Sequence, residues 1–350
     1  MPSMFLRALM CAGLLCAAVL ASAQVPYKIV TASERGTYIQ IGRDLAKFVA
    51  PDAGIALEVL PSAGSAENVQ RLRYEAGVKF ALVQSDVYQA FLNEAASGNG
   101  GAREMIRPLR LIMPLYNEEI YFIVRADSKL RFVHEIKDAR INVGPLLSGT
   151  AMSATTLYQG MFGSPSSDAN TTFFTNEEAL VKLTGDRSVD VVVVVAGQPA
   201  KLLVDMKPEA RQLIRLLEFD RNQPASQAAL KTYFPVTIRA ASYPNLLAAD
   251  TPGLAVKAFL VTYDYDMEHT VDRMTRFARS LCNNFERLRT QGHPKWREVD
   301  LAVPELTRGW SYYTPMYREL RSCIEKKPRP APEAPARNCT QQERILGLCR

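Results

Sequence analysis

The sequence predicts an α/β fold of two lobes, each with a largely parallel sheet flanked by helices. Short apolar segments alternate with amphipathic segments along most of the 350 residues, a pattern typical of parallel strands joined by helical crossovers. The run Val191–Val195 is apolar on both sides, as a strand buried between two helical layers must be. About 327 residues follow residue 23, more than one hydrophobic core usually organises, so two lobes are expected.

The first lobe is predicted to open with three strand-helix units. After them a loop rich in glycine at 97–101 leads into two extended segments with no helix between them, which indicates a crossing to the other lobe. The strands are expected at 28–31, 55–60 and 78–83, the helices at 38–50, 66–76 and 86–95, and the crossing segments at 109–115 and 120–125.

The second lobe repeats the alternation, with strands at 141–143 and 191–195 and helices at 150–162 and 176–183. An extended stretch at 254–263 is expected to return the chain to the first lobe. Apolar residues spaced by three and four predict one long helix at 267–288, capped by Asp266. The expected boundaries are 24–117 for the first part of lobe I, 118–250 for lobe II, and 251–325 for the return to lobe I and the C-terminal helices.

Residues 1–23 have the pattern of an export signal. Arg7 precedes an apolar stretch at 8–20, and Ala21-Ser22-Ala23 fits the small residues that signal peptidase accepts, so cleavage is expected after Ala23. The stretch is shorter than the ~20 residues that span a bilayer. We therefore expect an exported, soluble protein that begins at Gln24.

Four cysteines follow this signal, and an even number in an oxidising compartment predicts two disulfides among three possible pairings. We expect Cys282 to pair with Cys323 and Cys339 with Cys349; buried free thiols are the alternative. Residues 326–338 are predicted to form a proline-rich linker, and 339–350 a tail flanked by cysteines.

Charge and motif content disfavour several classes of function. The net charge is +6, but from Arg321 onward seven Lys/Arg stand against three Asp/Glu, so the body is close to neutral and nucleic acid is not the expected partner. The three histidines, at 134, 269 and 293, lack the spacing of metal ligands, and no nucleophile or phosphate-loop motif is present. We therefore expect no catalysis, no metal and no cofactor.

Small and hydroxylated residues recur where predicted strands pass into helices, at 31–42, 61–68, 84–86, 144–150 and, more weakly, 196–199. In open α/β sheets ligands bind at this edge, outside the carboxyl ends of the strands. Helix N-termini present unpaired N–H groups and a positive dipole end, which favour an anion. For any single junction, ordinary helix capping is the alternative.

The order of these motifs resembles one family. S-x-x-G-T-Y at 33–38, P-S-x-G-S-x-E-N at 61–68, A-L-V-Q-S-D at 81–86, G-P-x-x-S-G-T at 144–150 and D-V-V-V-V-V-A-G-Q-P at 190–199 are similar to the TAXI family, the extracytoplasmic solute-binding subunits of tripartite ATP-independent periplasmic (TRAP) transporters. The resemblance implies a two-lobed, type II-like periplasmic binding protein fold. It further implies that the protein acts in the periplasm, capturing a dicarboxylate, 2-oxoacid or acidic amino acid and delivering it to a membrane permease.

The resemblance also implies which residues contact the ligand. From the first lobe they are Ser33, Gly36, Thr37, Tyr38, Ser65, Asn68, Gln84 and Ser85, and from the second lobe Ser148, Gly149, Thr150 and Gln198.

Two features depart from the family pattern. The charged pair Glu34-Arg35 stands where small residues are usual, and we expect it to be solvated and to neutralise itself; the alternative is that Arg35 clamps a ligand carboxylate. The proline-rich tail is the second departure. It leaves open a sensory or interaction protein that reports its ligand to a membrane-bound sensor through the tail. With either partner, a monomer is expected.

Overall fold

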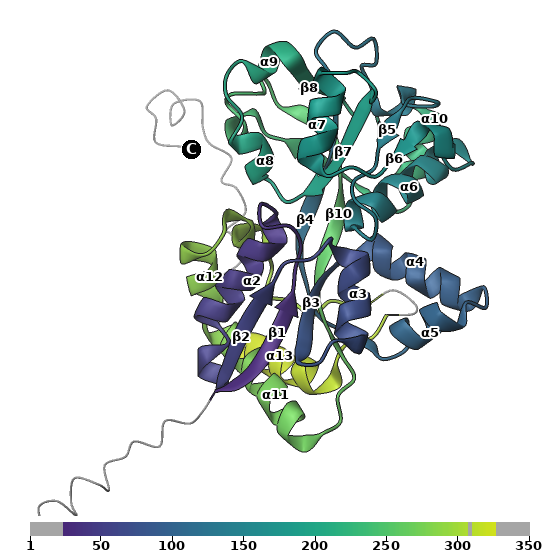
Figure 1. Cartoon of the computed structure of the whole chain (residues 1–350). Coiled ribbons are helices and arrows are strands. Elements are labelled where there is room, and N and C mark those ends of the chain that lie inside the picture. Colours follow the sequence, from purple (N-terminus) through teal and green to yellow (C-terminus); the bar gives the residue numbers. More distant parts are fainter. Residues whose placement is uncertain (1–23, 307–309, 327–350) are drawn as a thin grey trace, which may run out of the picture.

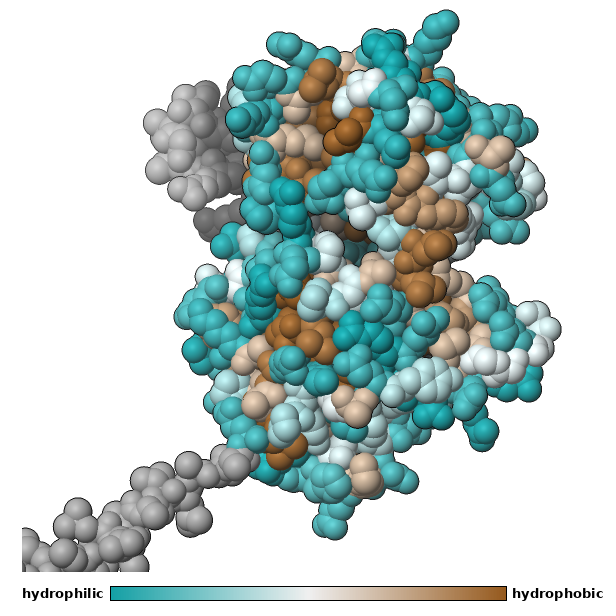
Figure 2. All heavy atoms as spheres, viewed as in Figure 1, coloured by the Kyte–Doolittle hydropathy of each residue, from teal (hydrophilic) through white to brown (hydrophobic). Residues whose placement is uncertain are grey.

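The computed structural model describes residues 24–306 and 310–326. The predicted signal at 1–23, nearly all of the predicted linker, and the tail with Cys339 and Cys349 lie outside the described residues. Within them the chain forms two lobes joined by two long strands, β4 (Leu109–Arg125) and β10 (Thr251–Tyr263) (Figure 1). Figure 2 shows the lobes meeting at a narrowed waist. No helix in the described ranges is long and apolar enough to cross a membrane.

One ten-stranded sheet runs through both lobes in the order β2-β1-β3-β10-β4-β7-β5-β6, with β8 beside β4 and β9 beside β10. The outer strands pair in parallel, β1 with β2 and β3, and β5 with β6 and β7. The remaining bounds are β1 (Val25–Val30), β2 (Ile55–Leu60), β3 (Val78–Gln84), β5 (Ile141–Asn142), β6 (Thr171–Thr172), β7 (Val191–Ala196), β8 (Ile214–Leu216) and β9 (Phe234–Ile238).

The predicted α/β class, with a sheet flanked by helices, is confirmed. Parallel pairing is restricted to the outer strands, because β4 and β10 carry the chain out to lobe II and back and are antiparallel to each other and to their neighbours. The two crossing segments predicted at 109–115 and 120–125 are one strand of 17 residues. The predicted domain boundaries stay a prediction.

Lobe I buries both faces of its strands, because successive side chains of a strand point to opposite faces. Ile29 faces one core and Val30 the other. The first core is covered by α2 (Thr37–Phe48), α11 (Glu268–Asn283), α12 (Phe285–Gln291) and α13 (Thr314–Lys326). The second is covered by α3 (Ser65–Tyr74), α4 (Ser85–Ala96) and α5 (Gly100–Ile106).

Lobe II is built in the same way around the valine run. Val191 and Val193 pack against α6 (Gly149–Phe162) and α10 (Pro224–Ala229), whereas Val192 and Val194 face α7 (Asn176–Thr184) and α8 (Lys201–Val204). The short helix α9 (Ala210–Leu213) precedes β8. The strand predicted at 191–195 is therefore buried on both faces, as expected.

The helix predicted at 267–288 is two helices, because Asn284 interrupts it between α11 and α12. The Asn284 amide donates hydrogen bonds to Asp52 and to the Ser280 carbonyl, while Phe285 and Leu288 continue the buried stripe on the same core. The apolar spacing thus persists across the break. The predicted Asp266 cap is wrong, because α11 begins after Met267 and has no side-chain cap.

The predicted disulfide between Cys282 and Cys323 is present and joins α11 to α13 within lobe I. It closes a loop between positions 41 residues apart. The second predicted disulfide, Cys339 with Cys349, lies outside the described residues.

Replacing both Cys282 and Cys323 with alanine should lower the free energy of unfolding by about 3–4 kcal/mol, because a loop of this length no longer restricts the unfolded chain. Urea unfolding of the oxidised wild type and the double variant measures the difference. Wild type reduced with dithiothreitol is the control and should match the variant. Equal stability of all three would show that the bridge contributes nothing.

Candidate functional site

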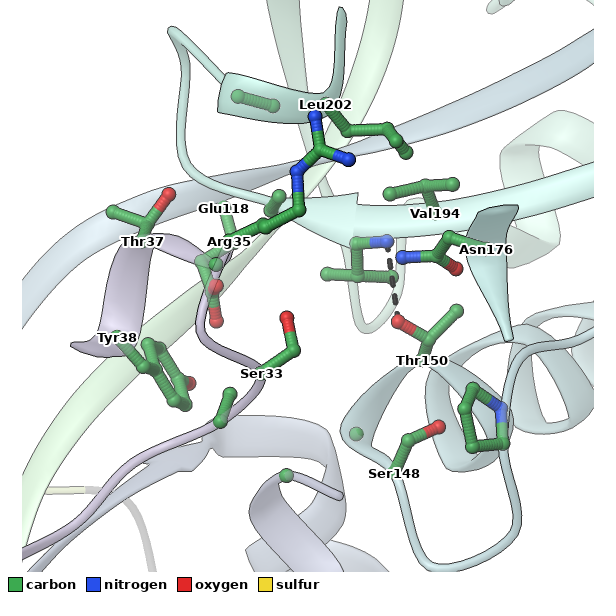
Figure 3. Close-up of a pocket in the computed structure, with 18 of the residues that line it drawn as sticks. Ser33, Arg35, Thr37, Tyr38, Glu118, Ser148, Thr150, Asn176, Val194 and Leu202 are labelled. Carbon is green, nitrogen blue, oxygen red and sulfur yellow. Dashed lines mark hydrogen bonds between the residues drawn. The ribbon is translucent and has the colours of Figure 1, made fainter. Parts of the chain in front are cut away.

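A cavity of about 110 Å³ lies between the lobes. Figure 3 shows Ser33, Tyr38 and Glu118 facing Ser148, Thr150 and Asn176 across it. Drug-sized ligands occupy pockets of ~300–1,000 Å³, so this cavity fits a small molecule. The lining residues are 32, 33, 35–38, 63–65, 84 and 118 on the lobe I side, and 145, 148–150, 176, 177, 194–196, 200 and 202 on the lobe II side.

Helices from both lobes begin at this cavity. The N-cap residues of α2, α3 and α4, which are Gly36, Gly64 and Gln84, line it, and none of these helices has a side-chain cap. In contrast, α6 and α7 from lobe II are capped by Ser148 and Thr175. The first N–H groups of a helix have no partner within the helix, so the ends of α2 and α3 favour an anion. At α4 the buried acid Asp86 already accepts the Val87 N–H.

The two lobes are in contact around the cavity, so the structure shows a closed state. The Glu67 N–H donates to the Leu147 carbonyl at 3.1 Å. The Thr37 hydroxyl donates to the Gly197 carbonyl at 3.0 Å.

Two glycines permit the closest approach between the lobes. A Cβ at Gly64 would lie 3.0 Å from the backbone nitrogen of Gly149, and Gly64 has φ +133°, which side chains disfavour. A Cβ at Gly149 would lie 1.9 Å from the side-chain oxygen of Gln84. The N-terminal ends of α3 and α6 meet this closely because neither glycine has a side chain.

Arg35 links the lobes at the edge of the cavity. Its guanidinium lies 3.0 Å from Asp205 and 3.6 Å from Glu177, both in lobe II, whereas Glu34 pairs with Arg43. The expectation that Glu34 and Arg35 neutralise each other is wrong, because closure brings lobe II acids within reach of Arg35. These side chains are partly exposed, so solvent screens both pairs and their contribution to stability is small.

Most of the predicted ligand-binding residues line the cavity, although their contact with a ligand stays a prediction. Thr150 is held in place by the Val195 N–H, which donates to its hydroxyl oxygen at 3.2 Å (Figure 3). The predicted residues at the cavity are Ser33, Gly36, Thr37, Tyr38, Ser65, Gln84, Ser148, Gly149 and Thr150.

Asn68, Ser85 and Gln198 are not among the lining residues. The buried Asn68 amide donates to the carbonyls of Thr31 and Leu82 and so ties α3 to the sheet. The Gln198 side-chain oxygen accepts the Arg239 N–H at 2.7 Å, and Ser85 lines a different cleft. The Asn68 and Gln198 side chains thus already have hydrogen bonds within the protein.

Glu118 is a lining residue that the sequence interpretation missed. Its side chain comes from the middle of β4 and is 3% exposed, and no described cation forms a salt bridge with it. Burial raises the pKa of Glu118 to about 8, and the neighbouring Glu119 adds to the rise, while Tyr38 and Gln84 oppose it. Two adjacent acids in the middle of a largely apolar strand are the signal that could have found it.

The adjacent Glu119 has a different environment, since neighbouring side chains of a strand point to opposite faces. It pairs at 2.8 Å with the fully buried Lys295, which also contacts Glu298 at 2.7 Å. The Gln198 N–H donates to its other oxygen at 2.6 Å. Glu119 is thus a paired structural acid, whereas Glu118 is an unpaired acid at the cavity.

The described residues contain no group of three or more His, Cys, Asp or Glu side chains arranged to hold a metal ion.

Residues 29–306 match the NMT1-like family. This chain belongs to that family. The match runs from the end of β1 to beyond β10 and so includes every residue that lines the cavity.

Solved structures similar to this family member include several binding proteins. The sulfonate-binding protein SsuA from Methylobacillus flagellatus KT is 13% identical, with TM-score 0.44 and 87% of each chain covered. XAC2383 from Xanthomonas citri bound to chloride ion is 12% identical, with TM-score 0.46, 86% of this chain and 97% of that chain covered. The CA3427 gene product of Candida albicans is 9% identical, with TM-score 0.47, 86% of this chain and 89% of that chain covered. These likenesses are too distant to carry a ligand or partner over to this chain.

Substituting Gly64→Ala should disfavour the closed state by about 1–3 kcal/mol, because the added Cβ would overpack against the Gly149 backbone of the opposite lobe. Small-angle X-ray scattering should show a larger radius of gyration than wild type. Gly98→Ala is the matched control, since Gly98 also has positive φ, +102°, but has nothing within 4 Å of its Cβ position. Equal compactness of Gly64→Ala and wild type would contradict a closure that depends on this glycine.

The raised pKa of Glu118 predicts a pH-dependent stability difference. The folded protein holds a proton on Glu118 that the unfolded chain has lost between pH ~4.5 and ~8, so this group lowers the unfolding free energy as pH rises through that window. Glu118→Gln should therefore gain stability relative to wild type from pH 4.5 to 8, with no further gain above. Urea unfolding across pH measures this gain.

Glu58→Gln is the matched control for this comparison, because it removes a carboxyl from strand β2 of the same lobe but not from the cavity. A constant stability difference between Glu118→Gln and wild type across the window would show that Glu118 is ionised in the folded protein.

Proposed function

We propose that this protein is an exported, monomeric solute-binding protein that captures a small carboxylate between its lobes and delivers it to a TRAP-type membrane permease. The observation that supports this best is the convergence of helix N-termini from both lobes on one cavity. Each such end stabilises a nearby negative charge by ~0.3–1 kcal/mol. Several together hold a carboxylate without a dedicated lysine.

The closed geometry suggests how capture works. A ligand bound at the uncapped ends of α2 and α3 gains contacts with Ser148, Gly149 and Thr150 only when lobe II closes. Ligand binding therefore favours the closed state, since only that state makes all the contacts. Closure also brings surfaces of the two lobes together, and a membrane partner can recognise that combined surface.

Two sequence features support the location and the class of permease. The signal pattern at 1–23 supports export. The ordered motifs from 33–38 to 190–199, which resemble the TAXI family, support a TRAP permease as the partner.

Thermal unfolding of the chain from residue 24 to 350 tests the proposal, after unfolding and refolding to remove any ligand carried through purification. The panel holds small monocarboxylates, dicarboxylates, 2-oxoacids, amino acids and inorganic anions. A ligand at a hundred times its dissociation constant adds about 2.7 kcal/mol and raises the midpoint by several degrees. No shift with any carboxylate would contradict the proposal.

Ser33→Ala should weaken binding of the best carboxylate about three- to tenfold, because a hydrogen bond contributes roughly 0.5–1.5 kcal/mol. The Ser33 hydroxyl points into the cavity (Figure 3). Isothermal titration calorimetry gives the affinity. Ser164→Ala is the control, since Ser164 is exposed and lies outside the cavity. Equal affinity of Ser33→Ala and wild type would place the ligand elsewhere.

A further inference from the structure

The charged side chains that line the cavity are unevenly paired. They are Arg35, Glu118 and Glu177, and Arg35 already contacts both Glu177 and Asp205. Among the described lining residues, the charged side chain without a salt-bridge partner is therefore an acid, Glu118. A second ligand carboxylate near Glu118 would meet no unpaired cation.

Among the described residues, the groups packed against Glu118 include no cation that forms a salt bridge with it. The Tyr38 hydroxyl from α2 and the Gln84 side chain approach it closely enough to favour its charged form by hydrogen bonding. Glu119 and Tyr116 flank it on β4, and Lys295 is committed to Glu119 and Glu298. Burying a carboxylate without a cation beside it is costly, and a cation on the ligand would offset that cost.

An ammonium group matches what is missing. It supplies three N–H donors and a positive charge, and the Tyr38 ring can add a cation–π contact. When an ammonium binds, the Glu118 carboxyl loses its proton to the solvent and becomes a carboxylate, while the ligand amine stays protonated. Binding at neutral pH therefore releases a proton.

We propose that Glu118 binds the ammonium group of a small amino acid whose carboxylate lies at the helix N-termini. This inference rests on the proposed function and narrows it: dicarboxylates and 2-oxoacids, which lack the amine, bind less tightly. The two charged ends of the ligand match an anion site made of α2, α3 and α6 and an acid placed on β4.

Matched ligand pairs that differ only at the α-carbon test the assignment: alanine with pyruvate, and glutamate with 2-oxoglutarate. Isothermal titration calorimetry at pH 7 in two buffers of different ionisation enthalpy gives both affinity and proton release. The amino member should bind at least tenfold more tightly. It should release most of one proton, because a carboxyl of pKa about 8 is mostly protonated at pH 7.

Glu118→Gln keeps the shape of the side chain but removes its charge. It should weaken binding of the amino member tenfold or more and abolish proton release, while leaving the affinity for the oxo member unchanged. Glu58→Gln should retain wild-type affinity and proton release. Glu118→Asp should retain the release with reduced affinity, so the charge can be tested even if Glu118→Gln does not fold.

The outcomes separate this inference from the function on which it rests. One contrary result is that the oxo member binds more tightly, with proton uptake, and loses affinity in Glu118→Gln. That result would show that Glu118 donates a hydrogen bond to a ligand carboxylate. The inference would then be wrong, and the binding function would stand. Equal binding of methylamine and alanine would remove the carboxylate from the assignment and overturn it. No binding by any member would overturn both.

Discussion

The antiparallel ladder between β4 and β10 is the interaction on which both lobes depend. It extends from the pair Leu109 and Tyr263 in lobe I to the pair Ile120 and Leu254 next to lobe II, and each lobe adds its own parallel strands to one end. Glu118 lies on this shared strand, opposite Val256 and close to a register shift in β10. The position of Glu118 is thus fixed by β4, the strand that passes between the lobes. Helix N-termini from both lobes line the same cavity.

Adjacent side chains of β4 point to opposite faces of the sheet, so its two neighbouring acids have different roles, one structural and one in binding. Glu119 turns toward Lys295 and Gln198 and is fully paired, whereas Glu118 turns toward the cavity and has no cation of its own. A buried acid with a salt bridge stabilises the protein only while the pair is intact. A buried acid without one makes the empty site less stable, and a ligand with the opposite charge relieves that penalty.

Most of the correct predictions from the sequence depended on short local patterns of residues. The helix starts at Thr37, Ser65 and Gly149 were anticipated because glycine and hydroxyl residues mark N-termini within a few positions. The partners of Arg35 and the hydrogen bonds of Gln198 were not anticipated, because they form between segments more than 40 residues apart. The break at Asn284 also escaped, because the apolar spacing continues through it. Tertiary partners rather than local patterns decide such features.

The order in which the chain builds lobe I affects how it folds. The core that holds Ile29 and Leu45 is completed by Phe277 and Leu320, and all of lobe II lies between these two parts in the sequence. Lobe II can therefore fold once β10 has been synthesised. The apolar face of β1, β2 and β3 stays exposed until α11 and α13, which cover it, have also been synthesised. Contacts this distant form slowly and leave strands open to wrong pairing. The strands and helices between residues 25 and 106 are thus the part of the chain whose apolar surface stays uncovered longest.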